Sequence, residues 1–219
     1  MTASDTAAAP REASTDAPAA ATPATPEAPA TGARARTRRA ILDAAVEVFS
    51  TNASASLGEV AQAAQVGRST LHRYFPERAD LIRAVGTEAL DRTRAAIRAA
   101  RLDDGDPAAA LRRLVIEYFD LGPWYMLLFH EASLAEDEAF WEESEAAEAP
   151  VRALFARGQE DGAFDPTLTV SWNQRTVWWT LFNAWSVMTE DGASRSDALR
   201  MAVRSVEGVV LAARSTPPS

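Results

Sequence analysis

Residue types that carry much of protein chemistry are absent or scarce in this 219-residue chain. Cysteine is absent, which excludes disulfides and thiolate chemistry and is compatible with a reducing compartment. Lysine is absent too, so arginine supplies all 22 basic side chains and must make any basic phosphate contact. The only histidines, His72 and His130, stand in no set of nucleophile, base and orienting group and in no metal-ligand cluster. We therefore expect neither an enzyme nor a bound metal or cofactor.

Long apolar runs are missing as well. No stretch of eighteen apolar residues is present, so we expect no membrane span. The first thirty or so residues, rich in Ala, Pro, Thr and Ser, lack the leading positive charge and apolar core of a secretory signal. Such a composition buries too little surface to fold, and we interpret residues 1–32 as the disordered tail of a cytoplasmic protein. Residues 214–219 are interpreted as a disordered C-terminus.

Sequence patterns typical of β-strands are also absent from the chain. Alternating apolar and polar runs bounded by turn residues do not occur, whereas helical spacing recurs throughout. The sequence therefore predicts an all-α fold of about nine helices. Their expected ranges are 33–51, 56–63, 67–74, 77–101, 107–120, 123–133, 138–161, 168–189 and 195–213.

Residues 56–81, SLGEVAQAAQVGRSTLHRYFPERADL, combine two short helices, a tight turn between them and the start of a third helix. Ser56 and Glu59 have the spacing of a capping box that opens the first helix. Phe75 precedes Pro76, and a residue before proline is disfavoured in the helical region, so the second helix ends there. Pro76 suits the first position of the next helix. This arrangement is typical of a helix-turn-helix that reads DNA.

The second of these short helices turns polar side chains outward while Leu71 and Phe75 face the core. Arginine donates to guanine or phosphate, and hydroxyl groups contact either. Basic residues near the starts of the first and fourth helices extend the same surface. An ordinary solvated face is the alternative interpretation. The candidate DNA-binding residues are Arg36, Arg68, Ser69, Thr70, His72, Arg73, Tyr74 and Arg78.

The chain from Arg36 to just beyond Pro76 resembles the tetracycline-repressor-like (TetR) family of bacterial transcriptional regulators. The resemblance lies in RRAILDAA (38–45), Phe49, EVAQAA (59–64) and TLHRYFP (70–76). It implies a helix-turn-helix DNA-binding domain at 33–78 and a ligand-binding and dimerisation domain at 79–213. In the family, the middle helices enclose a ligand cavity and the last two helices form a four-helix dimer interface.

Three positions depart from the family pattern. Gln65 stands where the family's turn usually has glycine, so backbone strain is expected if that position needs a positive φ. Gly67 stands where a serine or threonine usually caps the recognition helix, and His72 replaces the family's tyrosine. These departures concern the contacts of the reading helix more than its fold.

Charge divides between the two expected domains. Residues 33–101 hold twelve arginines and seven acidic residues, a net charge of +5. Residues 102–219 hold nine arginines and twenty acidic residues, a net charge of −11. Phosphate attraction is local to the surface that docks, so the acidic overall pI of about 4.8 does not exclude DNA binding. The acidic second part argues against a purely architectural DNA-binding protein, which remains a remote alternative.

All six tryptophans lie after residue 120, and four of them fall in the range 168–189. An aromatic set at helical spacing is often core, but the same side chains could line a cavity. Ring faces and acidic residues would favour an aromatic or cationic ligand, whereas Arg175 would suit an anion, so the sign of the ligand stays open. The candidate ligand-binding residues are Glu117, Trp124, Phe129, Glu131, Trp141, Phe155, Arg175, Trp178, Phe182 and Trp185.

The helix expected at 195–213 has an apolar face and a small residue that would allow close approach of a second helix. Packing within one chain is the alternative use of that face. The candidate interface residues are Trp172, Leu199, Val203, Val206, Gly208 and Val210.

These observations together predict a homodimeric, ligand-responsive transcriptional regulator. We expect a repressor that leaves a palindromic DNA operator when a lipophilic aromatic or cationic small molecule binds, in the manner of multidrug-efflux control. A ligand would tilt the helix expected at 77–101 and so change the spacing of the two reading helices. A sensor of an anionic or neutral metabolite or lipid on the same scaffold is the alternative.

Overall fold

The computed structural model describes residues 32–129, 131 and 137–212. Within these ranges the chain forms ten helices and a single isolated β-bridge, and it contains no strand. The predicted all-α fold class is confirmed. The helices are α1 (Gly32–Thr51), α2 (Leu57–Ala63), α3 (Arg68–Tyr74), α4 (Arg78–Ala100), α5 (Pro107–Phe119), α6 (Gly122–Phe129), α8 (Glu138–Ala147), α9 (Ala149–Glu160), α10 (Val170–Glu190) and α11 (Arg195–Val210).

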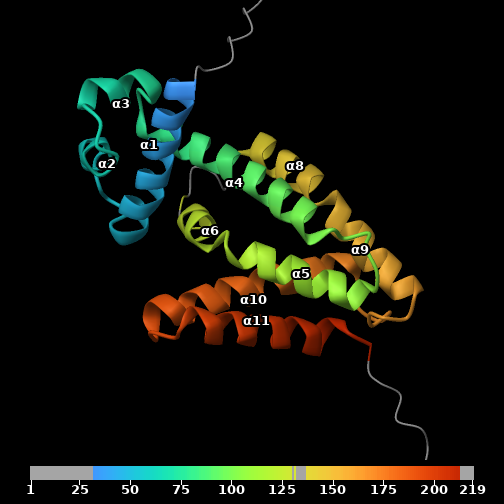
Figure 1. The fold of residues 1–219 in the computed structure, drawn as a ribbon. Coiled ribbons are helices and arrows are strands. Elements are labelled where there is room, and N and C mark those ends of the chain that lie inside the picture. Colours follow the sequence, from blue (N-terminus) through green and yellow to red (C-terminus); the bar gives the residue numbers. More distant parts are fainter. Residues whose placement is uncertain (1–31, 130, 132–136, 213–219) are drawn as a thin grey trace, which may run out of the picture.

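Helices α1, α2 and α3 form a small bundle at one end of the molecule, which we call the head (Figure 1). Ile41 and Phe49 of α1, Val60 of α2 and Leu71 of α3 are buried in its core. Helix α4 begins beside the head and runs into the larger body, so one rigid element connects the two parts (Figure 1).

The turn between α2 and α3 shows both the predicted cap and the predicted strain. The Glu59 backbone N–H donates to Ser56 Oγ at 3.3 Å, and the Ser56 N–H donates to the Glu59 carboxylate at 2.7 Å. The Ser56 N–H and the Ser56 hydroxyl both donate to the Glu59 carboxylate and lower the pKa of Glu59 below its ordinary value. Gln65 adopts a φ of 56°, a left-handed conformation that costs a non-glycine residue about 1 kcal/mol.

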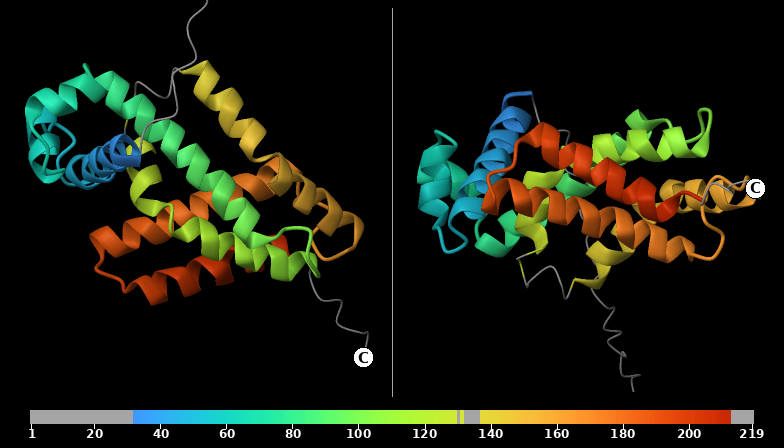
Figure 2. Two further views of the ribbon diagram at one scale, coloured as in Figure 1. Left: turned by 45° about the horizontal axis from the view of Figure 1, so that its top comes forward. Right: turned by 90° about the horizontal axis from the view of Figure 1, so that it is seen from below.

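The body is layered around α5 and α6. Helix α5 packs between α4 and the pair formed by α10 and α11, while α8 and α9 cover α4 and α5 (Figure 1). Helices α10 and α11 lie side by side along the outer edge of the body, where no other helix covers them in the view from below (Figure 2). The outer face of this pair is therefore free of other helices of the described chain.

The predicted helix 138–161 is wrong, because the structure breaks it at Glu148 into α8 and α9. Pro150 lies in the first turn of α9. Proline lacks a backbone N–H and its ring collides with the carbonyl four residues earlier, so it is tolerated at a helix start but not within a helix. The predicted helix 123–133 corresponds to α6, which ends at Phe129, and residues 130 and 132–136 lie outside the described residues.

The last helix also ends earlier than predicted, at Val210 instead of residue 213. Leu211 forms the isolated bridge with Phe164, and the flanking Asp165 N–H donates to the Val210 carbonyl at 2.9 Å. This pairing pulls the backbone into an extended conformation and stops the helix. Residues 1–31 and 213–219, where tails were predicted, lie outside the described residues.

None of the helices in the described part of the chain combines the length and apolar character that a bilayer crossing needs. The same residues contain no group of three or more histidine or acidic side chains placed to hold a metal ion.

Candidate DNA-binding surface and ligand cavity

Helix α3 presents a polar face to solvent at the tip of the head. Arg68, Ser69, His72 and Arg73 are exposed on this face, and Thr70 is half-buried beside them. Leu71 points the opposite way and is 1% exposed, which fixes the rotation of the helix. Six of the eight candidate DNA-binding residues lie on α3, and five of them share this polar face; their contact with DNA stays a prediction.

The other three candidates have different surroundings. Arg36 is exposed on α1. Tyr74 is half-buried, and its hydroxyl donates to the Arg34 carbonyl at 3.3 Å, so the ring braces α3 against α1. A hydrogen bond from the Tyr74 hydroxyl to a DNA phosphate stays a prediction, and it would require the hydroxyl to leave the Arg34 carbonyl.

Arg78 is a correction to the sequence interpretation. Its guanidinium lies 3.9 Å from the centre of the Phe49 ring and donates to the carbonyls of Ala53 and Ala55 at 3.0 and 3.1 Å. It also pairs with Glu131 at 2.7 Å. Three of the five guanidinium N–H groups are used in these contacts, so Arg78 joins the head to the body instead of serving only as a surface charge, and its contact with DNA stays a prediction.

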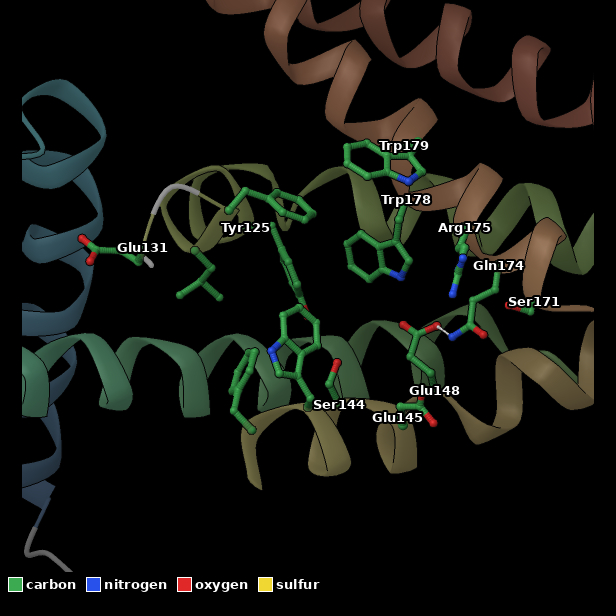
Figure 3. A pocket seen from close by; sticks show the side chains of 14 residues that line it. Tyr125, Glu131, Ser144, Glu145, Glu148, Ser171, Gln174, Arg175, Trp178 and Trp179 are labelled. Atoms are coloured by element: carbon green, nitrogen blue, oxygen red, sulfur yellow. Dashed lines mark hydrogen bonds between the residues drawn. The ribbon is translucent and has the colours of Figure 1, made fainter. Parts of the chain in front are cut away.

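A cavity of about 630 Å³ lies in the body between α6, α8 and α10, and we call it the α6–α8–α10 cavity (Figure 3). Six of its fourteen lining residues are aromatic, and three carboxylates and one guanidinium are the charged groups that line it. The lining residues are Tyr125, Leu128, Phe129, Glu131, Phe140, Trp141, Ser144, Glu145, Glu148, Ser171, Gln174, Arg175, Trp178 and Trp179.

Five of the ten predicted ligand-binding residues line this cavity: Phe129, Glu131, Trp141, Arg175 and Trp178. Trp178 is central among them in Figure 3.

The other five predicted ligand-binding residues lie outside the cavity wall. Trp124 is buried beneath Arg92, whose guanidinium lies 4.0 Å from the ring centre. Trp185 is buried, and its indole N–H donates to the Phe119 carbonyl at 3.0 Å. Both tryptophans are therefore packing residues.

Phe155 is fully buried against Phe164. Phe182 meets Phe129 edge to face, so it supports the cavity wall from behind. Glu117 is half-buried on α5 and does not line the cavity. The two phenylalanines are thus core or supporting residues.

Two aromatic stacks shape the floor of the cavity. The Trp178 ring centre lies 4.9 Å from that of Tyr118 and 4.5 Å from that of Tyr125. The Tyr125 hydroxyl is buried and lies 2.7 Å from Thr93 Oγ, and burial raises the pKa of Tyr125 well above its ordinary value. These contacts hold the Trp178 ring in place while part of its surface faces the cavity, so this part of the wall is pre-formed.

Glu148 is the most informative residue that the sequence interpretation missed. It is 4% exposed, between α8 and α9, and its carboxylate accepts hydrogen bonds from the Tyr118 hydroxyl at 2.6 Å and from Gln174 Nε2 at 2.9 Å. Burial raises the pKa of Glu148 above its ordinary value, and the hydrogen bonds partly offset that effect. The nearby Pro150 was the only sequence signal that this glutamate sits at a helix break.

Helices α10 and α11 carry large exposed apolar side chains, of which Trp179 also borders the cavity. Trp172, Trp179, Met201 and Val209 are 58%, 63%, 45% and 44% exposed. Apolar patches of this kind often mark a protein interface.

Of the predicted interface residues, Trp172 and Gly208 are exposed, and Leu199 and Val203 are half-buried. Val206 and Val210 are buried against the same chain, because every fourth residue of α11 from Ala198 onward faces inward. Those two valines hold α11 to the body and are corrected to core residues.

Comparison with known proteins decides the family. The family model described as bacterial regulatory proteins, tetR family, matches residues 41–85. HTH-type transcriptional repressor LfrR from Mycolicibacterium smegmatis is 42% identical over 167 residues, which is 75% of this chain and 85% of LfrR. This chain belongs to the TetR family.

Solved structures of TetR-like proteins agree with this result. The crystal structure of LfrR from Mycobacterium smegmatis in complex with proflavine is 34% identical and has a TM-score of 0.67, covering 81% of this chain and 99% of that one. A second crystal structure of LfrR is 35% identical with a TM-score of 0.54, covering 80% of this chain and 100% of that one. TetR-family proteins are transcriptional regulators, so the expected helix-turn-helix regulator is confirmed at the level of the family.

Proposed function

We propose that this chain is a dimeric repressor that leaves its DNA operator when a flat, positively charged aromatic compound enters the α6–α8–α10 cavity. The observation that carries the proposal is the make-up of the wall, where aromatic rings stand beside three carboxylates and a single guanidinium. Ring faces and carboxylates both attract organic cations. The LfrR complex with proflavine, a flat organic cation, supports the same ligand class.

The DNA-binding half of the proposal rests on the exposed face of α3. In a dimer, two such helices must lie about 34 Å apart to enter successive major grooves of a near-palindromic site. The exposed apolar face of α10 and α11 supports pairing of two chains through these helices. Family members with this architecture act as dimers, which favours the same arrangement here.

Helix α4 is the proposed route from cavity to head. Its first residue, Arg78, pairs with Glu131, which lines the cavity. A ligand that draws Glu131 away would release Arg78 and let α4 tilt, which would change the spacing of the reading helices. Coupling requires only that the ligand bind the tilted state better, and an affinity ratio of 100 corresponds to about 2.7 kcal/mol.

A drug-efflux gene is the target that this ligand class favours. Arg175 supports a second candidate, a sensor of anionic metabolites or lipids, because its guanidinium also lines the cavity.

The two candidates separate in a tryptophan-fluorescence titration with proflavine, a long-chain fatty acid and a neutral aromatic compound. Any ligand that binds is then added to the protein on operator DNA, which is first selected from a random duplex library. Saturable quenching by proflavine with release of DNA supports the proposal. Binding of the fatty acid alone favours the second candidate, and DNA binding that no ligand changes overturns both.

A further inference from the structure

Glu148 combines three properties that no other carboxylate of the cavity shares. It lines the cavity, it is almost completely buried, and its side-chain hydrogen-bond donors are the neutral groups of Tyr118, Gln174 and Trp178. Among the described residues, no ion pair includes Glu148, and the only cation that favours its charged form is Arg152, which acts without forming an ion pair. A buried carboxylate without a cationic partner is costly to a protein, so its presence in a cavity wall requires an explanation.

The other two cavity carboxylates are placed differently. Glu131 is already paired with Arg78 at 2.7 Å. Glu145 is exposed on α8, where water screens its charge. Only Glu148 thus offers a positive ligand an unpaired charge in a site from which water is largely excluded, and electrostatic attraction is strongest in such a site.

A purely local structural role does not explain Glu148. It occupies the residue before α9, yet its side chain makes no capping hydrogen bond to that helix. The carboxylate instead points toward Trp178 and Gln174 of α10, as Figure 3 shows. A carboxylate has about four acceptor positions, and the three side-chain donors leave one for a ligand donor.

The aromatic surface beside it suits a flat ligand. Trp178 lines the cavity, and its ring is held by Tyr118 and Tyr125. A flat ligand that stacks along these aromatic rings would bring an N–H group at its edge close to the Glu148 carboxylate. Charge-assisted hydrogen bonds of this type are about twice as strong as neutral ones.

Resting on the proposed function, we propose that Glu148 is the specificity-determining residue of the α6–α8–α10 cavity, which selects flat aromatic cations that carry an N–H donor over neutral compounds of the same shape. Tyr118 and Gln174 act as positioning residues that hold the carboxylate toward the ligand.

The test compares two ligands of one shape in the full-length dimer. Proflavine is a cation at about pH 8, whereas acridine, its unsubstituted ring, is uncharged there. Dissociation constants are measured by fluorescence for the wild type, Glu148→Gln and the matched control Glu142→Gln. Glu142 is exposed on α8 and does not line the cavity, so its substitution removes the same charge without touching the site.

We expect Glu148→Gln to weaken proflavine binding by about tenfold or more, the usual effect of losing a hydrogen bond to a buried charge. Acridine binding should change less than about twofold in that variant, and Glu142→Gln should leave both constants within the same limit. A second variant, Glu148→Asp, retains the charge and should keep the preference for proflavine. It preserves the test if the glutamine variant does not fold.

The outcomes separate this inference from the function on which it rests. Equal loss of both ligands, or unchanged proflavine binding, in Glu148→Gln overturns the role of Glu148 while leaving a ligand-responsive repressor intact. A wild-type protein that binds neither ligand overturns the proposed cation response itself, and the inference with it.

Discussion

Arg78 joins the head to the cavity wall, and its replacement by alanine tests that joint. The substitution removes the stack on Phe49, two hydrogen bonds to the carbonyls of Ala53 and Ala55, and the ion pair with Glu131. The Arg78 side chain is 36% exposed, so the ion pair with Glu131 contributes only about 0.5–1 kcal/mol after screening by solvent.

The remaining contacts are larger in sum. Hydrogen bonds from a charged donor contribute about 1.5 kcal/mol each when sheltered, and a stacked cation contributes about 0.5–1 kcal/mol. Water replaces the donor at the exposed Ala53 carbonyl but less readily at Ala55, which is buried. We therefore expect Arg78→Ala to lower the free energy of unfolding by about 3 kcal/mol.

Urea unfolding measures this loss, and a double-mutant cycle with Glu131→Gln isolates the ion pair. The cycle should return a coupling energy of about 0.5–1 kcal/mol. Operator binding provides a second readout, because loss of a phosphate contact would reduce the salt dependence of binding by about one unit. If Arg78→Ala changes the free energy of unfolding by less than about 0.5 kcal/mol and also reduces the salt dependence of operator binding, Arg78 contacts DNA and does not join the head to the body.

Five further substitutions test other parts of the structure. Arg73→Ala should weaken operator binding at least about tenfold in a fluorescence-anisotropy titration while the dimer stays folded, and intact binding would remove Arg73 from the reading surface. Gln65→Gly should raise the free energy of unfolding by about 0.5–1 kcal/mol, since glycine adopts its φ of 56° without strain. Trp178→Ala should weaken ligand binding, whereas Trp185→Ala should destabilise the fold by about 3–5 kcal/mol in urea unfolding. Glu148→Gln should stabilise the protein at pH 8. Folding raises the pKa of Glu148, so its charged form lowers the stability of the folded protein at pH values above that raised pKa. This cost disappears as the pH falls below the pKa that Glu148 has in the unfolded chain. The stability gained by Glu148→Gln should therefore shrink toward low pH in urea unfolding.

The head was predictable because its signals are local. The capping box of Ser56 and Glu59 and the end of α3 before Pro76 each depend on residues within four positions, and the structure shows both as expected. Pro76 itself is not at the first position of the next helix, because α4 begins at Arg78 with Glu77 as its N-cap. The strain at Gln65 also follows from the turn alone. The surroundings of Arg78 were not predictable in this way, since Glu131 is fifty-three residues away in sequence.

The cavity shows where helical periodicity stops being informative. Trp178 and Trp185 are seven residues apart on α10 and therefore share nearly one face of the helix. They lie about 10 Å apart along its axis, and their neighbours differ at those heights. Trp178 meets the open cavity, whereas Trp185 packs over Gly122, where a Cβ would lie 2.7 Å from the indole nitrogen. The position of each tryptophan along α10 relative to α6 therefore decides whether its ring lines the cavity or packs in the core.

The same reasoning explains why charge was easier to assign to domains than to sites. Composition separates a basic head from an acidic body, but it does not show which acids are already neutralised. Glu131 is occupied by Arg78, and Glu148 is occupied only by neutral donors. Of these two carboxylates, Glu148 would gain a cationic partner when a cation binds, whereas Glu131 would have to exchange Arg78 for the ligand. Under the proposed function, contact with Glu148 would add affinity and contact with Glu131 would act on the head, so a ligand that engages Glu148 alone should bind without releasing DNA.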